Sequence, residues 1–348
     1  MNNKIAVIGA GSVGYSVVSD LALKGFKVNL YDDKKFESNL IPVKDAGGIE
    51  IYGCGIDGFA KIDTVTTNLE EAIENVKFIL ICTQAHAHDE LATKLSQYIK
   101  DGQFIILLPG YWGSVIFYNI IRLKKNKLIK IAEARTTLYA CSRIEGQSKV
   151  NIKIIKNSHI AAIPARDTDD IIDEMNTIFP SRFFPAKNVL EVAINAAGLF
   201  QTAMSILSTS RIESGGDFYH FREGYTPSVL KVLQAIWEEK GLILKALKLN
   251  DIFSFEKMKK MALNPTPEQL SINRPNNMSH RYMTENCPFR LVPMSSLGLM
   301  LNIPTPITNA IIELASTING INYYKYGRTM EKLGLSSLKI NEFIKFFK

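Results

Sequence analysis

Gly9, Gly11 and Gly14 form a G-x-G-x-x-G motif near the start of the chain, directly after the strand-forming run Lys4–Ile8. In such a motif the first glycine allows a tight turn, the second lets a pyrophosphate approach the backbone, and the third lets the following helix pack closely on the strand. The start of that helix also presents free N–H groups and the positive end of its dipole. A second strand pattern ends at Asp32, where an acidic side chain would hold a ribose hydroxyl. Together these residues predict a dinucleotide-binding site.

Two later strand patterns, 77–83 and 104–108, also end at residues that suit a cofactor site. Ligands of open α/β sheets bind beyond the carboxyl ends of the strands, so the residues there are expected to line the nicotinamide side. His86 and His88 stand at the same edge as weaker candidates. The full predicted cofactor-binding set is Gly9, Gly11, Ser12, Val13, Gly14, Asp32, Thr83, Gln84, Pro109 and Gly110.

The choice between the two nicotinamide dinucleotides rests on the end of the second strand pattern. Asp32 favours NAD, because a carboxylate repels the 2′-phosphate of NADP. Lys34 and Lys35 follow directly and weaken that repulsion, so NADP stays an alternative.

The elements that must position these residues alternate between strand and helix patterns, and they give way to helices after Pro185. We therefore expect an α/β fold in which a doubly wound Rossmann-type domain at 1–185 is followed by an all-α domain at 186–348. A hairpin is expected within the first domain at 48–53 and 59–62. The sheet is expected to extend through four further strand patterns, at 129–134, 137–141, 150–155 and 159–164.

The second domain is expected to open with one long buried helix from Asn188 through Ser208, because apolar side chains cover nearly all of its faces. Gly198, Gln201 and Ser205 fall on one stripe of this helix. Buried polar groups need partners, so this stripe either makes internal hydrogen bonds or lines a ligand site.

The composition describes an ordinary globular chain: 348 residues, 22% charged and 46% hydrophobic, have room for about two domains. The net charge of +7 suits an anionic ligand, whereas the lack of a compact basic patch with interleaved aromatics argues against nucleic acid. Four widely spaced cysteines indicate neither a metal site nor a disulfide framework. The sequence shows no signal peptide and no apolar run near the roughly 18 residues of a membrane span, so a cytoplasmic protein without membrane contact is expected. A homodimer is left open.

Several segments resemble the octopine/nopaline (opine) dehydrogenase family. Beyond the glycine motif they are 108–110, 132–136 and 223–229, and the most specific is Arg281–Pro288, of sequence RYMTENCP. The resemblance implies a Rossmann domain followed by an all-α domain, as the patterns above also predict. It further implies an oxidoreductase that condenses an amino acid with a 2-oxo acid and reduces the resulting imine with a nicotinamide hydride. The expected substrate is therefore a small anion.

The resemblance also places functional residues in the second domain, and there the chain departs from the family. Arg281 stands where the family binds a substrate carboxylate, and its guanidinium suits bidentate binding. The family's paired His and Asp are matched by Gln201 and Asn286, amides that hydrogen-bond but cannot carry a proton near neutral pH. General acid–base help is worth about 10²–10⁴-fold, so this departure bears directly on activity.

Three interpretations of the amide pair are open. In the first, a neighbouring side chain (Glu285, His220 or His280) replaces the missing acid–base group. In the second, the enzyme reduces a different substrate whose proton comes from water or from the substrate itself, as in a preformed imine that is already protonated. In the third, the chain binds dinucleotide or another ligand without turnover. A hydroxy-acid or ketopantoate-type reductase shares the domain order, but the lysine of its second-domain helix has no match here, because Lys187 precedes that helix. The predicted catalytic set is Gln201, Asn286, Arg281, Glu285 and His220.

Overall fold

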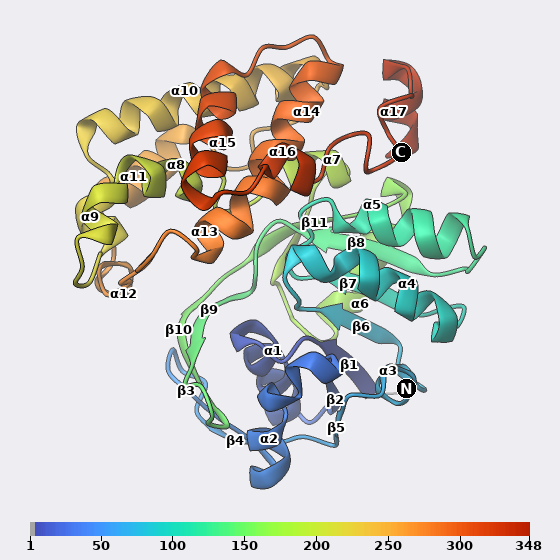
Figure 1. The fold of residues 1–348 in the computed structure, drawn as a ribbon. Coiled ribbons are helices and arrows are strands. Elements are labelled where there is room, and N and C mark those ends of the chain that lie inside the picture. The colour runs from blue at the N-terminus through green and yellow to red at the C-terminus, as the bar shows by residue number, and fades with distance from the viewer. Residues whose placement is uncertain (1–3) are drawn as a thin grey trace. The chain divides into compact units, whose positions relative to one another are not determined.

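The computed structural model of the protein describes residues 4–348, which divide into two units (Figure 1). Unit 1 comprises the described residues up to Val192 together with Lys348, and unit 2 comprises Ala193–Phe347. The division lies close to the predicted domain boundary after residue 185, and that boundary stays a prediction.

Within the described residues, the larger sheet of unit 1 has eight strands in the order β12-β11-β8-β7-β6-β1-β2-β5. The strands from β5 to β8 are all parallel, and their order matches the 3-2-1-4-5-6 arrangement of a doubly wound nucleotide-binding sheet. This confirms the predicted fold class of the first domain. The strand bounds are β1 (Lys4–Ile8), β2 (Lys27–Tyr31), β5 (Thr64–Thr66), β6 (Phe78–Ile81), β7 (Phe104–Leu107), β8 (Lys130–Ala134), β11 (Ser158–Ala162) and β12 (Phe183–Pro185).

A second sheet of unit 1 corrects part of the sequence-based prediction. Its order is β4-β3-β10-β9, with bounds β3 (Gly48–Tyr52), β4 (Gly58–Lys61), β9 (Tyr139–Arg143) and β10 (Lys149–Ile155). The hairpin of β3 and β4 is confirmed, and β8 and β11 do extend the large sheet. The expectation that the patterns at 137–141 and 150–155 extend it too was wrong, because β10 pairs with β3 and β9 instead.

Helix α1 (Ser12–Leu23) explains why the second sheet is needed. Its side chains Val17, Val18 and Leu21 are fully buried, and they share one core with Val28 of the large sheet and Val150 of the small one. A helix that is apolar on opposite faces must be covered on both. The small sheet therefore covers the face of α1 that the large sheet leaves open (Figure 1).

The remaining helices of unit 1 follow the strands as the patterns predict. Asn68 caps α3 by accepting hydrogen bonds from the backbone N–H groups of Glu70 and Glu71. The helix bounds are α2 (Ile41–Ala46), α3 (Leu69–Ile73), α4 (His88–Tyr98), α5 (Gly113–Phe117) and α6 (Thr168–Asn176).

Unit 2 is built from helices, as predicted for the second domain, and α7 (Val189–Ile194) leads the chain into it. Two short irregular helical turns, 220–224 and 287–291, interrupt the regular ones. The helix bounds are α8 (Gln201–Leu207), α9 (Thr209–Glu213), α10 (Pro227–Ala246), α11 (Phe255–Leu263), α12 (Pro267–Leu270), α13 (Arg281–Thr284), α14 (Val292–Met300), α15 (Pro306–Asn319), α16 (Tyr323–Tyr326) and α17 (Ile340–Phe346).

The single long helix expected from Asn188 through Ser208 was wrong. Helix α7 ends before Gly198 and α8 begins after it, because Gly198 adopts a φ of +88°, which a right-handed helix does not allow. Its carbonyl oxygen accepts hydrogen bonds from Asn286 Nδ2 at 3.2 Å and from the backbone N–H of Gln201 at 3.1 Å. Gly198 therefore does not share a helical stripe with Gln201, whereas Ser205 does and bonds internally, its Oγ donating to the Gln201 carbonyl at 2.8 Å.

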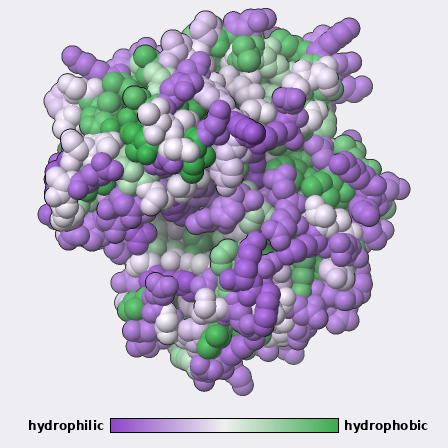
Figure 2. All heavy atoms as spheres, in the orientation of Figure 1, coloured by the Kyte–Doolittle hydropathy of each residue, from purple (hydrophilic) through white to green (hydrophobic). Residues whose placement is uncertain are grey.

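The surface carries mainly hydrophilic residues on the face drawn in Figure 2, with hydrophobic residues gathered in separate groups. None of the helices described in residues 4–348 combines the length and apolar character needed to span a membrane.

Candidate functional site

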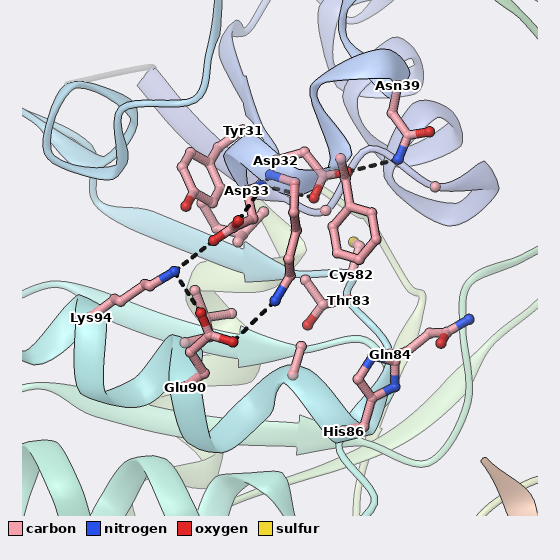
Figure 3. Close-up of a pocket in the computed structure, with 17 residues that line it drawn as sticks. Tyr31, Asp32, Asp33, Asn39, Cys82, Thr83, Gln84, His86, Glu90 and Lys94 are labelled. Carbon is pink, nitrogen blue, oxygen red and sulfur yellow. Dashed lines mark hydrogen bonds and ion pairs between the residues drawn. The ribbon is translucent and has the colours of Figure 1, made fainter. Parts of the chain in front are cut away.

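A pocket of about 230 Å³ lies in unit 1 at the carboxyl ends of β1, β2 and β6 (Figure 3). The segment 34–39 and the start of α4 complete its walls. This is where a doubly wound sheet binds its ligand, next to the strand at which the order reverses. The predicted cofactor residues that line it are Gly9, Gly11, Asp32, Thr83 and Gln84.

The glycine motif has the geometry that its spacing predicts. A Cβ on Gly14 would stand 1.8 Å from the Gly9 carbonyl oxygen, so only glycine allows α1 to pack this closely on the loop. A Cβ on Gly11 would meet nothing within 4 Å, so the space in front of Gly11 is clear for a ligand. Ser12 and Val13 form the first turn of α1 and, like Gly14, do not line the pocket.

The hydroxyl of Thr83 is buried in the pocket wall, and it has no hydrogen-bond partner among the described residues (Figure 3). Buried polar groups are normally satisfied, so an unpaired hydroxyl in a pocket suits a ligand that carries hydrogen-bonding groups. This hydroxyl and the clear space at Gly11 fit a dinucleotide. His86 is exposed and lines the same pocket, whereas His88 is fully buried and packs against Phe117, which is a structural role.

The side chain of Asp32 stabilises the glycine loop by a hydrogen bond to its backbone. Its Oδ2 accepts hydrogen bonds from Ala10 N and Asn39 Nδ2, both at 3.0 Å, and its Oδ1 accepts one from the backbone N–H of Asp33. Burial raises the pKa of the Asp32 carboxyl, while these hydrogen bonds act in the opposite direction. Much of the hydrogen-bonding capacity of this carboxylate is therefore used inside the protein.

Sequence reasoning missed Asn39 and Arg143. Asn39 Oδ1 accepts a hydrogen bond from Arg143 Nη2 at 2.5 Å, and Arg143 Nη1 donates to the Ala10 carbonyl at 3.3 Å. A guanidinium of the small sheet thus stands beside the glycine loop, where a pyrophosphate would need a positive charge. No local motif marks Arg143, because only the pairing of β9 with β10, and of β10 with β3, brings it there.

Pro109 and Gly110 belong to a loop that does not line the pocket. The loop is held by the fully buried Glu133, whose carboxylate accepts hydrogen bonds from Trp112 N at 3.2 Å and from Ser114 N at 3.1 Å. A Cβ on Gly110 would stand 2.2 Å from that of Glu133, so the two segments touch directly. Glu133 therefore fixes the course of the loop that the sequence places at the nicotinamide side.

Unit 2 brings Gln201 and Asn286 together. Asn286 Nδ2 donates to Gln201 Oε1 at 2.7 Å and to the Gly198 carbonyl at 3.2 Å. Arg290, another residue that sequence reasoning missed, is buried beside them, with Nη1 2.4 Å from the point where a Cβ on Gly198 would stand. A side chain at position 198 would displace this guanidinium, so the glycine makes room for it.

Arg281 and Glu285 form an ion pair on consecutive turns. Arg281 Nη2 lies 2.5 Å from Glu285 Oε2, the arginine side chain being 39% exposed and that of the glutamate 4%. The neighbouring His280 caps α13, its Nδ1 accepting a hydrogen bond from the backbone N–H of Tyr282 at 3.2 Å. The half-exposed guanidinium is thus accessible, whereas the carboxylate of Glu285 is not.

His220 is enclosed by aromatic rings, with Phe221, Tyr225 and Tyr282 centred 4.3, 6.0 and 5.8 Å from its own ring. Desolvation by burial lowers its pKa to about 4, and a hydrogen bond with the backbone of Arg274 opposes the shift. Burial likewise lowers the pKa of His280 to about 4. Both imidazoles are therefore neutral at pH 7, and neither is a ready proton donor there.

Two sequence-family models match the chain. Residues 185–319 match "NAD/NADP octopine/nopaline dehydrogenase, alpha-helical domain", and residues 5–109 match "Ketopantoate reductase PanE/ApbA". The second match lies wholly within unit 1, so it concerns the nucleotide-binding part and not the residues of unit 2.

Whole-chain relatives agree with the first match. The opine dehydrogenase of Arthrobacter sp. (strain 1C) is 32% identical over 346 residues, which cover 96% of this chain and 95% of that protein. A solved structure of octopine dehydrogenase with NADH and pyruvate is similar with a TM-score of 0.80 at 17% identity, over 96% of both chains. One of yersinopine dehydrogenase with NADP⁺ reaches 0.71 at 12% identity, over 100% of this chain and 98% of that one. At such identities the structural likeness concerns the fold.

Proposed function

The chain belongs to the opine dehydrogenase family, and from this premise we propose that it reduces the imine of an amino acid and a 2-oxo acid in the cytoplasm. It is an NAD(P)-dependent oxidoreductase that acts on imine or oxo-acid substrates. When the cofactor is bound, its nicotinamide ring supplies the hydride. Unit 1 holds the dinucleotide, and unit 2 binds and orients the substrate. The free cysteines Cys54, Cys82, Cys141 and Cys287 suit the reducing compartment proposed.

The pocket of unit 1 is the observation that supports this proposal most. Gly11 leaves its backbone open to a pyrophosphate, Arg143 lies beside the loop as a counter-charge, and Thr83 offers an unpaired hydroxyl. These groups suit an anionic dinucleotide, and each acts by binding rather than by proton transfer.

Arg281 is the proposed anchor for a substrate carboxylate. A guanidinium has five N–H donors, and the ion pair with Glu285 engages Nη2. The exposed part of the side chain can therefore bind a second carboxylate while Glu285 holds its orientation. This role selects a small anionic substrate, as expected for an amino acid joined to a 2-oxo acid.

The hydrogen bonds of the amide pair define what Gln201 can do. The Gly198 carbonyl only accepts, so the Asn286 atom that meets it is the donor Nδ2. The same Nδ2 donates to Gln201, so the Gln201 atom at that contact is the acceptor Oε1. The two N–H groups on Nε2 then remain for a substrate. We propose that Gln201 donates a neutral hydrogen bond to the reacting group and that Asn286 positions it.

A protonated imine fits this arrangement. Such an iminium already carries the proton on nitrogen, so addition of a hydride to its carbon gives the secondary amine without a general acid. Gln201 then needs only to orient the substrate, which an amide can do and which its fixed Oε1 contact favours.

The test is a titration followed by an assay. The protein is first titrated with NADH and with NADPH, and saturable binding of at least one is expected. Oxidation of the bound cofactor is then measured with pairs of amino acids and 2-oxo acids. Binding without turnover on any pair would favour a non-catalytic dinucleotide-binding protein, the function that the loss of both ionisable groups otherwise suggests. Failure to bind either dinucleotide would refute the proposal.

A further inference from the structure

Four charged side chains border one part of the pocket in unit 1 (Figure 3). Lys94 Nζ lies 2.6 Å from Asp33 Oδ2 and 2.7 Å from Glu90 Oε1, and Lys35 Nζ lies 3.1 Å from Glu90 Oε2. The chain of contacts thus runs from Asp33 through Lys94 and Glu90 to Lys35, with alternating charge. We call these four residues the rim.

The ion pairs favour the charged forms of Asp33, Glu90 and Lys94. Hydrogen bonds from Lys94 lower the pKa of Asp33 and, together with Lys35, that of Glu90. The same contacts raise the pKa of Lys94. The rim is therefore neutral as a whole, although it contains two lysines.

Asp33, rather than Asp32, is the carboxylate at the pocket edge with the fewer internal bonds. Asp32 is 7% exposed and accepts three hydrogen bonds from the glycine loop, Asn39 and its own neighbour. Asp33 accepts one from the backbone N–H of Lys35 and one from Lys94. The adenosine ribose would therefore meet Asp33 and the three rim residues paired with it in turn, Lys94, Glu90 and Lys35.

The ribose substituent is what distinguishes the two cofactors. A phosphate monoester carries about −1.5 to −2 charges at neutral pH and needs cations, whereas a hydroxyl is neutral. Lys35 and Lys94 are suitable cations, but both already contact Glu90, one on each carboxylate oxygen. Glu90 therefore pairs with both lysines, as a 2′-phosphate would, and its negative charge repels such a phosphate.

We propose that Glu90, in the first turn of α4, is a specificity residue that keeps this pocket for NAD by neutralising Lys35 and Lys94. Removing its charge exposes a lysine pair that binds a 2′-phosphate. This inference rests on the proposed function, since it takes the pocket to bind a nicotinamide dinucleotide.

The experiment measures dissociation constants of NADH and NADPH by fluorescence titration of the intact chain and of Glu90→Gln. The intact chain is expected to bind NADH at least about tenfold more tightly than NADPH. For NADPH, the dissociation constant of Glu90→Gln is expected to be at least about tenfold lower than that of the intact chain. For NADH, it is expected to change less than about threefold. The gain should shrink as salt is raised, because the rim is half-exposed and salt screens it.

Glu37→Gln is the matched control. Glu37 also pairs with two lysines, Lys34 and Lys44, but it does not line the pocket. Its substitution should leave both dissociation constants unchanged. Adding Lys94→Met to Glu90→Gln should remove the gained NADPH affinity, because the phosphate then has lost one of its two cations.

The outcomes separate the inference from the proposed function. If the intact chain binds neither dinucleotide, the proposed function fails. If it binds NADH but Glu90→Gln does not improve NADPH binding, or if it binds both cofactors equally, the proposed function stands and the inference is overturned. A gain equal to that of Glu37→Gln would also overturn it, because any lost carboxylate would then have the same effect.

Discussion

The pocket of unit 1 is bordered by charged side chains, whereas the amide pair of unit 2 consists of neutral ones. The pocket is bordered by ion pairs that are half-exposed, and Arg143 brings a further cation to the glycine loop. The contact between Gln201 and Asn286 joins two neutral side chains, although Arg290 is buried beside them. One region is thus equipped to hold an anion, and the other to orient a polar group.

This difference suits the functions proposed for the two regions. Binding of a dinucleotide depends on backbone shape and fixed charges, which the pocket of unit 1 offers. Proton transfer depends on an ionisable group, which two amides do not supply. The comparison therefore predicts that changes in unit 1 act on cofactor affinity, whereas changes in unit 2 act on the rate and on the substrate.

The largest effects on stability and cofactor affinity are expected at the glycine motif. Gly14→Ala places a methyl group 1.8 Å from the Gly9 carbonyl oxygen, so the loop and α1 must move apart. We expect a loss of about 3 kcal/mol or more in the free energy of unfolding, together with loss of NADH binding. Denaturant unfolding and a fluorescence titration measure the two.

Gly11→Ala is the companion variant, since its methyl group meets no protein atom within 4 Å. We expect unchanged stability and a loss of NADH affinity of about 100-fold, because the methyl group takes space that the pyrophosphate needs. Equal affinities of the Gly11 variant and the intact chain would show that the dinucleotide does not approach this loop.

The largest effect on the rate is expected from an ionisable pair at positions 201 and 286. Gln201→His combined with Asn286→Asp returns a proton donor and its orienting carboxylate to residues that already touch at 2.7 Å. If the intact chain lacks only acid–base help, the rate of imine formation and reduction should rise by about 10²–10⁴-fold. Its pH–rate profile should gain an ionisation that the intact chain lacks.

Each single variant serves as a control for the pair. Gln201→His alone leaves the imidazole against an amide, so it should recover only part of the rate. No gain in the double variant would mean that an acid–base group is already supplied elsewhere, and Glu285, the buried residue that precedes Asn286 in the sequence, would be the first candidate.

Arg281→Ala should raise the KM for the 2-oxo acid by about 100-fold and leave the dissociation constant of NADH unchanged. It also removes the ion pair of the buried Glu285 carboxylate, so some stability should be lost. Arg281→Ala with Glu285→Gln separates the two effects, because the second change removes that buried charge. A KM that recovers in the double variant would show that Arg281 acts on the fold and not on the substrate.

The contrast between the regions also explains what the sequence could predict. The glycine motif, its strand and its helix are contiguous, so their spacing predicted Gly9, Gly11 and Asp32 at the pocket. The buried strand pattern at 77–83 added Thr83, because ligands bind beyond the carboxyl ends of such strands. Strand patterns at 137–141 and 150–155 were found, but which sheet they join depends on pairing with β3, far away in the chain. Pairing of this kind leaves no local signal.

The helical pattern marked Gln201 as a possible site residue, but its partner Asn286 was predictable only through the family resemblance. The helix break at Gly198 depends on contacts with Asn286 and Arg290, which lie in another segment, so the apolar pattern around it predicted one continuous helix. The contact of Gln201 with Asn286 is equally remote in sequence. The sequence did not predict Lys94 and Glu90 for a different reason. Charged residues on a helix usually form a solvated face, and only the folded structure shows that these two line a pocket.

The smallest expected effect is a pH dependence of stability from unit 2. The pKa of His220 is about 4 in the folded chain, below its ordinary value of 6.5, because burial disfavours the charged ring. Between these values the unfolded chain binds more protons than the folded one, so stability is fully present above pH 6.5 and is lost as the pH falls toward 4. Denaturant unfolding should show a loss of about 2 kcal/mol between pH 7 and pH 5 from this residue.

His220→Phe should flatten that dependence, since it removes the titrating group and keeps a ring among Phe221, Tyr225 and Tyr282. His86→Gln is the matched control, because His86 is exposed at the pocket of unit 1 and its loss should leave the slope unchanged. His280 contributes in the same direction, so a residual slope is expected in the His220 variant. If the slope of His220→Phe equals that of the intact chain, the ring accepts a proton in the folded state as easily as in the unfolded one. His220 would then be open to solvent and able to exchange protons with a substrate, and the view of unit 2 as a site that orients without transferring protons would have to be abandoned.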